Sequence, residues 1–212
     1  MADAGGTKVA ETRASDGVYL GTFSVGSSPA GIAFDWANIW VANSGSNNVT
    51  KLRASDGVNL GTFSVGSSPI GIAFDGVNIC VANTFSNSVT KLRASDGVNL
   101  GTFSVGSSPV GIAFDGANIW VANSGSNNVT KLRASDGVNL GTFSVGSSPV
   151  GIAFDGANIW VTNYTSNNVT KLRASDGTTL GTLPVGNFPD AIVFDGANIW
   201  VANAGSNTVS KL

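Results

Sequence analysis

The hydrophobic and polar positions of this chain repeat every forty residues. The phrase Arg-Ala-Ser-Asp-Gly recurs at this spacing and begins at Arg13, Arg53, Arg93, Arg133 and Arg173. A strict period of this size indicates repeated supersecondary units, each of which buries its apolar face only by stacking on a neighbour. Residues 13–212 hold five such periods, so the sequence predicts a single domain over residues 1–212.

Each period predicts four short strands. In one copy these strands are residues 31–34, 38–43, 48–53 and 59–65, separated by Asp-, Ser-, Asn- and Gly-rich turn signals. The first two strands are apolar without alternation, which is typical of strands covered on both faces. With no helical period in the chain, the pattern predicts an all-β fold, a β-propeller of five four-stranded blades.

Two stretches of the repeat resemble a known family. Residues 39–50 and 61–73 are similar to the bacterial YVTN-type propeller repeat, a relative of the NHL repeat, and the name-giving tetrapeptide is matched best at 160–163, Trp-Val-Thr-Asn. The resemblance covers residues 13–212 and implies a propeller fold. Members of this family commonly have six or seven blades, so five is a departure. One propeller scaffold serves many unrelated activities, so the resemblance implies little about function.

The two ends of the chain predict how the ring closes. Thr7–Arg13 matches the third strand of a blade and Leu20–Val25 the fourth, while Asn207–Leu212 is again a third strand. We expect Leu20–Val25 to pair with Asn207–Leu212, which removes an exposed sheet edge. Residues 1–12 then form a redundant or loosely ordered strand, because Thr12 stands where every other copy has Leu.

The composition and net charge of the chain limit the classes of partner that it is expected to bind. The net charge of −2 and the pI near 4.8 give no basic surface, so we expect no nucleic-acid partner and no anionic membrane partner. The first residues do not form a signal peptide, which favours a cytoplasmic location for the chain as given and an extracellular one if a leader was removed. Near-identical blades have interchangeable interfaces, so we expect mostly monomer with some swapped oligomers.

The candidate chemistry is sparse. The chain has no histidine, which excludes His-based triads and His metal sites. Among family relatives, the virginiamycin B lyase-like propellers are enzymes whose chemistry relies on a histidine, so their activity is not carried over. We expect no enzyme activity, no cofactor and no metal. Ten of the thirteen carboxylates are repeated turn residues, for which hydrogen bonding to the turn is a better explanation than a ring of cation ligands.

One strand position carries a large side chain in nearly every copy. Trp40, Trp120, Trp160 and Trp200 share this position, and Cys80 occupies it in the remaining copy. At an apolar inner-strand position, stacked tryptophans form the core between blades more often than a ligand site. Cys80, the single cysteine, is expected to be a buried, unreactive thiol.

The exceptions to the repeat give the candidate site. Phe85, Tyr164, Phe188 and Asp190 depart from the other copies in two loop types that emerge on the same face. Aromatic residues on loops over a rigid scaffold favour a binding surface, so we predict a non-enzymatic binding or scaffold protein with an unknown protein or a small polar ligand on this face. Three alternatives stay open: neutral drift in these loops, a purely structural repeat protein with no discrete site, and a propeller lyase or hydrolase.

Overall fold

The structure is a computed structural model that describes residues 5–212, and in that range it is built from β-strands alone. No helix in the described range is long and apolar enough to cross a bilayer. The chain divides into two compact units, residues 1–102 and 103–212, with the boundary inside strand β10. Each unit is described by itself below.

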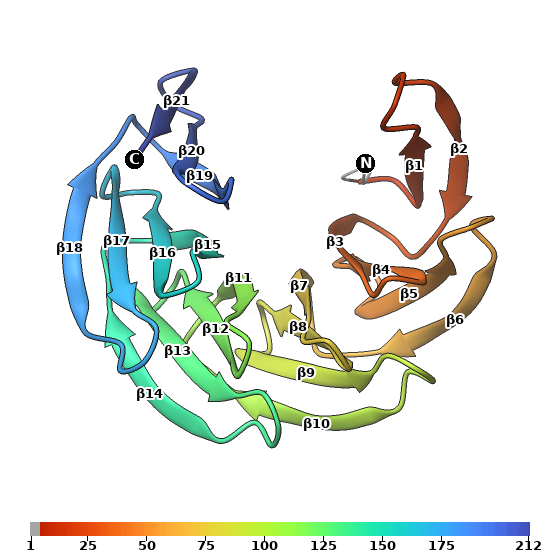
Figure 1. The fold of residues 1–212 in the computed structure, drawn as a ribbon. Helices are drawn as coiled ribbons and strands as arrows, with labels where there is room; N and C mark the ends of the chain where they lie inside the picture. Colours follow the sequence, from red (N-terminus) through yellow and green to blue (C-terminus); the bar gives the residue numbers. More distant parts are fainter. Residues whose placement is uncertain (1–4) are drawn as a thin grey trace. The chain divides into compact units, whose positions relative to one another are not determined.

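The first unit holds a hairpin and a series of four-stranded sheets (Figure 1). The hairpin consists of β1 (Lys8–Thr12) and β2 (Tyr19–Ser24). The next sheet contains β3 (Pro29–Phe34), β4 (Asn38–Asn43), β5 (Asn48–Arg53) and β6 (Asn59–Ser64). The sheet after it contains β7 (Pro69–Phe74), β8 (Asn78–Asn83), β9 (Ser88–Arg93) and β10 (Asn99–Ser104).

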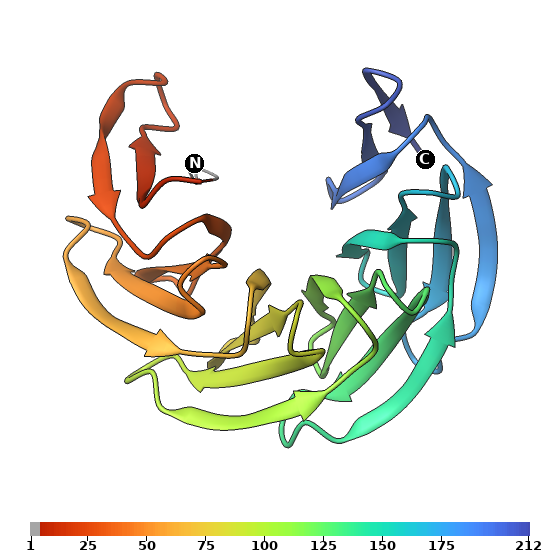
Figure 2. The ribbon, with the colours of Figure 1, turned by 180° about the vertical axis from the view of Figure 1, so that it is seen from behind.

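The second unit repeats the same sheet twice and ends in a shorter one, which Figure 2 shows from behind. The first sheet contains β11 (Pro109–Phe114), β12 (Asn118–Asn123), β13 (Asn128–Arg133) and β14 (Asn139–Ser144). The second contains β15 (Pro149–Phe154), β16 (Asn158–Asn163), β17 (Asn168–Arg173) and β18 (Thr179–Pro184). The last has three strands, β19 (Pro189–Phe194), β20 (Ile199–Asn203) and β21 (Thr208–Lys211).

The predicted all-β repeat of four antiparallel strands is confirmed, because each complete sheet follows the chain in sequence order. Five closed blades remain a prediction, since the described residues form four complete sheets flanked by sheets of two and three strands.

The closing pair predicted from the chain ends is wrong. Strand β2 pairs with β1, with Val9 opposite Phe23, so β1 occupies the edge of β2 that was predicted for residues 207–212. The physical reason is local: β1 and β2 are joined by the same short turn that joins the third and fourth strands of every complete sheet, and short loops close at the lowest entropic cost. Lys8–Thr12 is therefore a regular strand rather than a loose one.

The repeated aspartates shape turns, as the sequence predicted. Asp35 Oδ1 accepts hydrogen bonds from the backbone N–H groups of Ala37 and Asn38, and Asp35 Oδ2 accepts one from the Trp40 indole at 2.8 Å. Partial burial acts to raise the pKa of Asp35, but these hydrogen bonds outweigh it and hold the pKa below its usual range.

Neighbouring sheets within a unit are joined by an apolar core. In the first unit, Trp40, Ala42 and Val49 of one sheet pack with Ile79 and Leu92 of the next. Trp120 occupies the same place in the second unit, and both indoles are fully buried, as expected for a core position.

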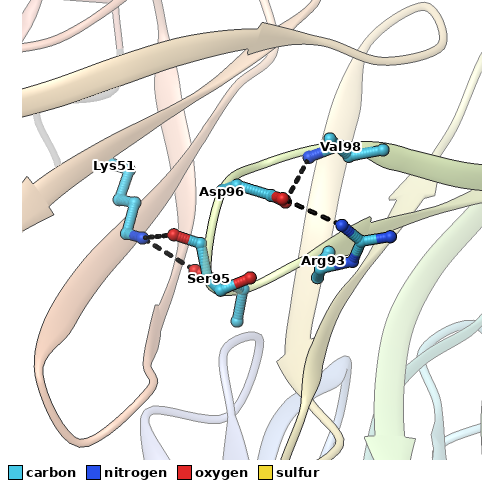
Figure 3. A network of polar contacts seen from close by, with 6 residues as sticks. Lys51, Arg93, Ser95, Asp96 and Val98 are labelled. Atoms are coloured by element: carbon cyan, nitrogen blue, oxygen red, sulfur yellow. Dashed lines mark hydrogen bonds and ion pairs between the residues drawn. The ribbon is translucent and has the colours of Figure 1, made fainter.

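A buried lysine adds a polar link to this core (Figure 3). Lys51 Nζ donates hydrogen bonds to the carbonyl oxygens of Ala94 at 2.7 Å and Ser95 at 3.1 Å, in the turn of the following sheet. That turn is shaped by Asp96, which accepts hydrogen bonds from Arg93 and from the Val98 N–H. The link is repeated in the second unit, where Lys131 contacts Ala174 and Ser175.

Candidate functional site

Two of the four predicted site residues lie against each other. Tyr164 follows β16 and Phe188 precedes β19, and their rings stack with centroids 4.9 Å apart and an angle of 17° between the planes. Both rings stay partly exposed. In the preceding copy the same two places hold Ser124 and Ser148, so an aromatic pair has replaced a serine pair. Such pairs contribute roughly 0.5–1.5 kcal/mol beyond burial.

The backbone holds the Phe188 loop in place. The Phe188 N–H donates to Asn167 Oδ1 at 2.9 Å, and its carbonyl oxygen accepts a hydrogen bond from the Ala204 N–H. The ring lies directly over Gly205, where a Cβ would collide with it. The φ of +52° at Phe188 recurs at Ser148, so the conformation belongs to the loop type and does not arise from the aromatic side chain.

Asp190 lies two residues further on, near the start of β19, with an exposed side chain. Its carbonyl oxygen accepts a hydrogen bond from Thr162 Oγ1 at 2.9 Å, and the same hydroxyl accepts one from the Gly151 N–H at 2.7 Å. The carboxylate is thus attached to a backbone segment that is fixed to the neighbouring sheet. It adds a negative charge beside the aromatic pair in sequence, where the preceding copy has the neutral Val150.

Phe85, the fourth predicted site residue, belongs to the first unit, which is described by itself. Its side chain is 79% exposed, and its N–H donates to the carbonyl oxygen of Ser67. This hydrogen bond confirms that the two variable loop types lie side by side, as the strand directions predicted. Within the second unit, the structure stacks Tyr164 on Phe188, and Asp190 follows Phe188 by two residues in the chain.

Nucleophile and metal chemistry find little support among residues 5–212. No group of three or more His, Cys, Asp or Glu side chains is placed there to hold a metal ion. Burial raises the pKa of the Cys80 thiol to about 12, and the nearby Asp75 carboxylate acts in the same direction. Because the thiolate is the reactive form, Cys80 is poorly suited to act as a nucleophile.

Sequence reasoning missed two features. Thr162 stands where other copies have Ala, and this exception is a signal that could have linked it to Asp190. In the first unit, an apolar groove of about 610 Å³ lies between the β1–β2 hairpin and the sheet β3–β6. Its signal in the sequence was that residues 7–25 match only the third and fourth strands of the repeat.

Comparison with known proteins supports the fold. No protein-family model and no curated protein matches the chain. Two solved structures superpose well: a functionally unknown protein from Desulfotomaculum acetoxidans DSM 771 (TM-score 0.83, 19% identity) and a streptogramin B lyase (TM-score 0.80, 20% identity). Each match covers 97% of this chain and 75% of the other chain.

A third similar structure is the hydrazine synthase of Kuenenia stuttgartiensis, with a TM-score of 0.64 and 15% identity over 97% of this chain and 89% of that one. At these identities the likeness concerns the fold alone. Together with the repeated four-stranded antiparallel sheets, it identifies a β-propeller-like repeat protein.

Proposed function

We propose that this chain is a non-enzymatic binding protein of the YVTN/NHL propeller type, with its ligand site at Tyr164, Phe188 and Asp190. The site lies on the face that carries the variable loops. A stacked aromatic platform with a carboxylate two residues further along the chain suits a small hydroxyl-rich or cationic ligand, because aromatic faces attract cations and the carboxylate accepts hydrogen bonds.

The observation that carries this proposal is the contact between two exceptions. Tyr164 and Phe188 depart from the repeat at positions 24 residues apart, yet their rings stack at 4.9 Å. If these two surface positions had changed independently by neutral drift, two new aromatic residues would not be expected to meet in one contact. The contact also leaves both rings partly exposed. Thr162, a third exception, fixes the segment that carries Asp190.

Two other functions compete with binding. A purely structural repeat protein would need no such cluster, and its exceptions would be energetically neutral. A lyase is suggested by one structural neighbour, but this chain has no histidine to supply a general base and its single thiol is buried. The aromatic pair supports the binding hypothesis over a purely structural role.

The test is to restore the repeat at the site. The triple variant Tyr164→Ser, Phe188→Ser, Asp190→Val uses residues found at the same positions in the preceding copy. Phe85→Gly is the matched control, since it also restores the repeat at an exposed aromatic but lies in the other unit. The wild type is screened by thermal shift against soluble oligosaccharides and quaternary ammonium compounds, since a ligand of the native state raises the melting temperature.

We expect the triple variant to fold, to lose the shift given by any compound that stabilises the wild type, and to differ from Phe85→Gly in this respect. A triple variant that keeps the shift contradicts the proposed site. A more stable triple variant, with no compound shifting the wild type, supports the structural alternative instead.

A further inference from the structure

The apolar groove of the first unit is an uncovered copy of the interface between sheets. Phe34 and Ile32 line it and are 45% and 41% exposed, which is high for residues of these types on a first strand. Five lining residues of the sheet β3–β6 lie forty positions before residues of the next sheet that belong to the complete core: Ile32, Phe34, Ile39, Leu52 and Ala54. The groove therefore has the surface that one sheet normally presents to the sheet before it.

The complete interface shows what covers such a surface. The counterparts of the groove residues pack against Trp40, Ala42 and Val49 of the preceding sheet, and Trp40 is 0% exposed there. Among the described residues of the first unit, the hairpin β1–β2 is a two-stranded sheet, and it brings only Val9 of this set to the groove. No tryptophan-bearing second strand from residues 5–102 lies there.

The last sheet of the chain carries the missing residues. Trp200, Ala202 and Val209 occupy the repeat positions of Trp40, Ala42 and Val49. The face of β20 that carries Ile199 and Val201 is covered. The face that carries Trp200 and Ala202 is open, and Trp200 is 37% exposed.

The polar residues at the two surfaces also match. Within each unit, a lysine donates to two carbonyl oxygens of the turn in the next sheet, as Lys51 does to Ala94 and Ser95 and Lys131 to Ala174 and Ser175. The corresponding carbonyls beside the groove are those of Ala54 and Ser55, and the lysine position of β1 holds Glu11, which has no proton to donate. Lys211 occupies that position in β21, where its Nζ lies 5.2 Å from the Trp200 ring centroid and contacts no following turn.

From these matches we infer that the groove binds the last sheet, β19–β21, of a second copy of this chain. Strand β21 takes the place of β1 beside β2, Trp200 fills the groove, and Lys211 donates to the carbonyl oxygens of Ala54 and Ser55. The junction then forms one more four-stranded sheet, shared between two chains. Since the two surfaces differ, the contact is head to tail and can continue into a ring or a longer assembly.

The test uses two variants that damage opposite surfaces. Trp200→Glu places a charge on the last sheet, and Phe34→Glu places one in the groove. The control is Phe85→Glu, at an exposed aromatic on neither surface. Mass is measured by size exclusion with light scattering over a range of protein concentrations, and circular-dichroism melts check that each variant folds.

We expect the wild type and Phe85→Glu to associate as concentration rises. Each single-surface variant should weaken association at least about tenfold, as is usual for a central tryptophan or phenylalanine. An equimolar mixture of Trp200→Glu and Phe34→Glu should form dimers, because each retains the surface that the other lacks.

A further variant tests whether β21 of a second chain replaces β1 beside β2. Glu11→Lys with Thr12→Leu gives β1 the residues of the repeat, so β1 should hold its place beside β2 and association should weaken.

Three results would overturn the inference. The first is a wild type that stays a single chain at every concentration, as it would if its own last sheet filled the groove. The others are association that survives Trp200→Glu and a mixture of the two variants that forms no dimers.

Discussion

Replacing Lys51 by Met tests the polar link between sheets. Lys51 is 6% exposed, and its ammonium donates to two carbonyl oxygens at 2.7 and 3.1 Å and lies 5.0 Å from the Trp40 ring centroid. Hydrogen bonds to a charged group contribute roughly 1.5–3 kcal/mol, and a desolvated cation–π contact about 2 kcal/mol. Burial of the ammonium costs part of this sum. We expect Lys51→Met to lower the free energy of unfolding by about 2–3 kcal/mol.

The assay is urea unfolding followed by tryptophan fluorescence at low protein concentration. Lys131→Met should cost about the same, because its hydrogen bonds of 2.7 and 3.0 Å and its ring distance of 4.9 Å repeat the geometry. Lys211→Met is the matched control: it has the ring contact but no following turn, so its effect should stay below about 1 kcal/mol. If Lys51→Met and Lys211→Met lower the free energy of unfolding by the same amount, the hydrogen bonds to the two carbonyl oxygens contribute nothing to stability, which would refute the prediction.

The remaining predictions concern single copies of the repeat. Cys80→Trp should be tolerated or stabilising, because other copies bury an indole there and Asp75 occupies the position of its acceptor; thermal melts check this, and slow labelling of the native thiol checks that Cys80 is buried. Asp115 has a pKa held below its usual range, since burial raises it less than the Trp120 indole and other donors lower it. The stability that Asp115 contributes is therefore present above its unfolded pKa of about 4 and lost as pH falls through the folded value, so Asp115→Asn should flatten the loss of stability between pH 6 and pH 3 in urea melts. Trp36→Gly should raise stability by roughly 1 kcal/mol, since the φ of +74° at Trp36 suits glycine and the other copies have glycine there; an unchanged melting temperature would argue against this.

Most of the fold could be predicted from the sequence, because its signals are local. Asp-Gly turns and apolar inner strands recur in every copy, and the predicted 38–43 and 48–53 are the observed β4 and β5. The pairing of the chain ends was predicted wrongly because Asn207–Leu212 and Thr7–Arg13 both fit the third-strand position beside β2. The choice between them was made from similarity to the repeat, which takes no account of the lower entropic cost of a short connecting turn.

The site was predictable only in part. That the two variable loop types share a face follows from strand direction, but the stacking of Tyr164 on Phe188 depends on which neighbouring sheets the loops belong to. Thr162 is marked in the sequence as an exception to the repeat, but its role depends on a close backbone approach between β15 and β19 that the exception alone does not show. The groove could not be seen from any one residue, since it lies between a two-stranded hairpin and a four-stranded sheet.

The lysine links also give the chain a mechanical order. Each one joins a sheet to the turn of the sheet that follows, as Lys51 does to Ala94 and Lys131 to Ala174, so a sheet without a follower is the least secured. Under tension applied at the two ends, the chain should come apart sheet by sheet rather than all at once. Because every repeat has forty residues, each rupture should release about 140 Å of extended chain, giving a force trace with evenly spaced steps.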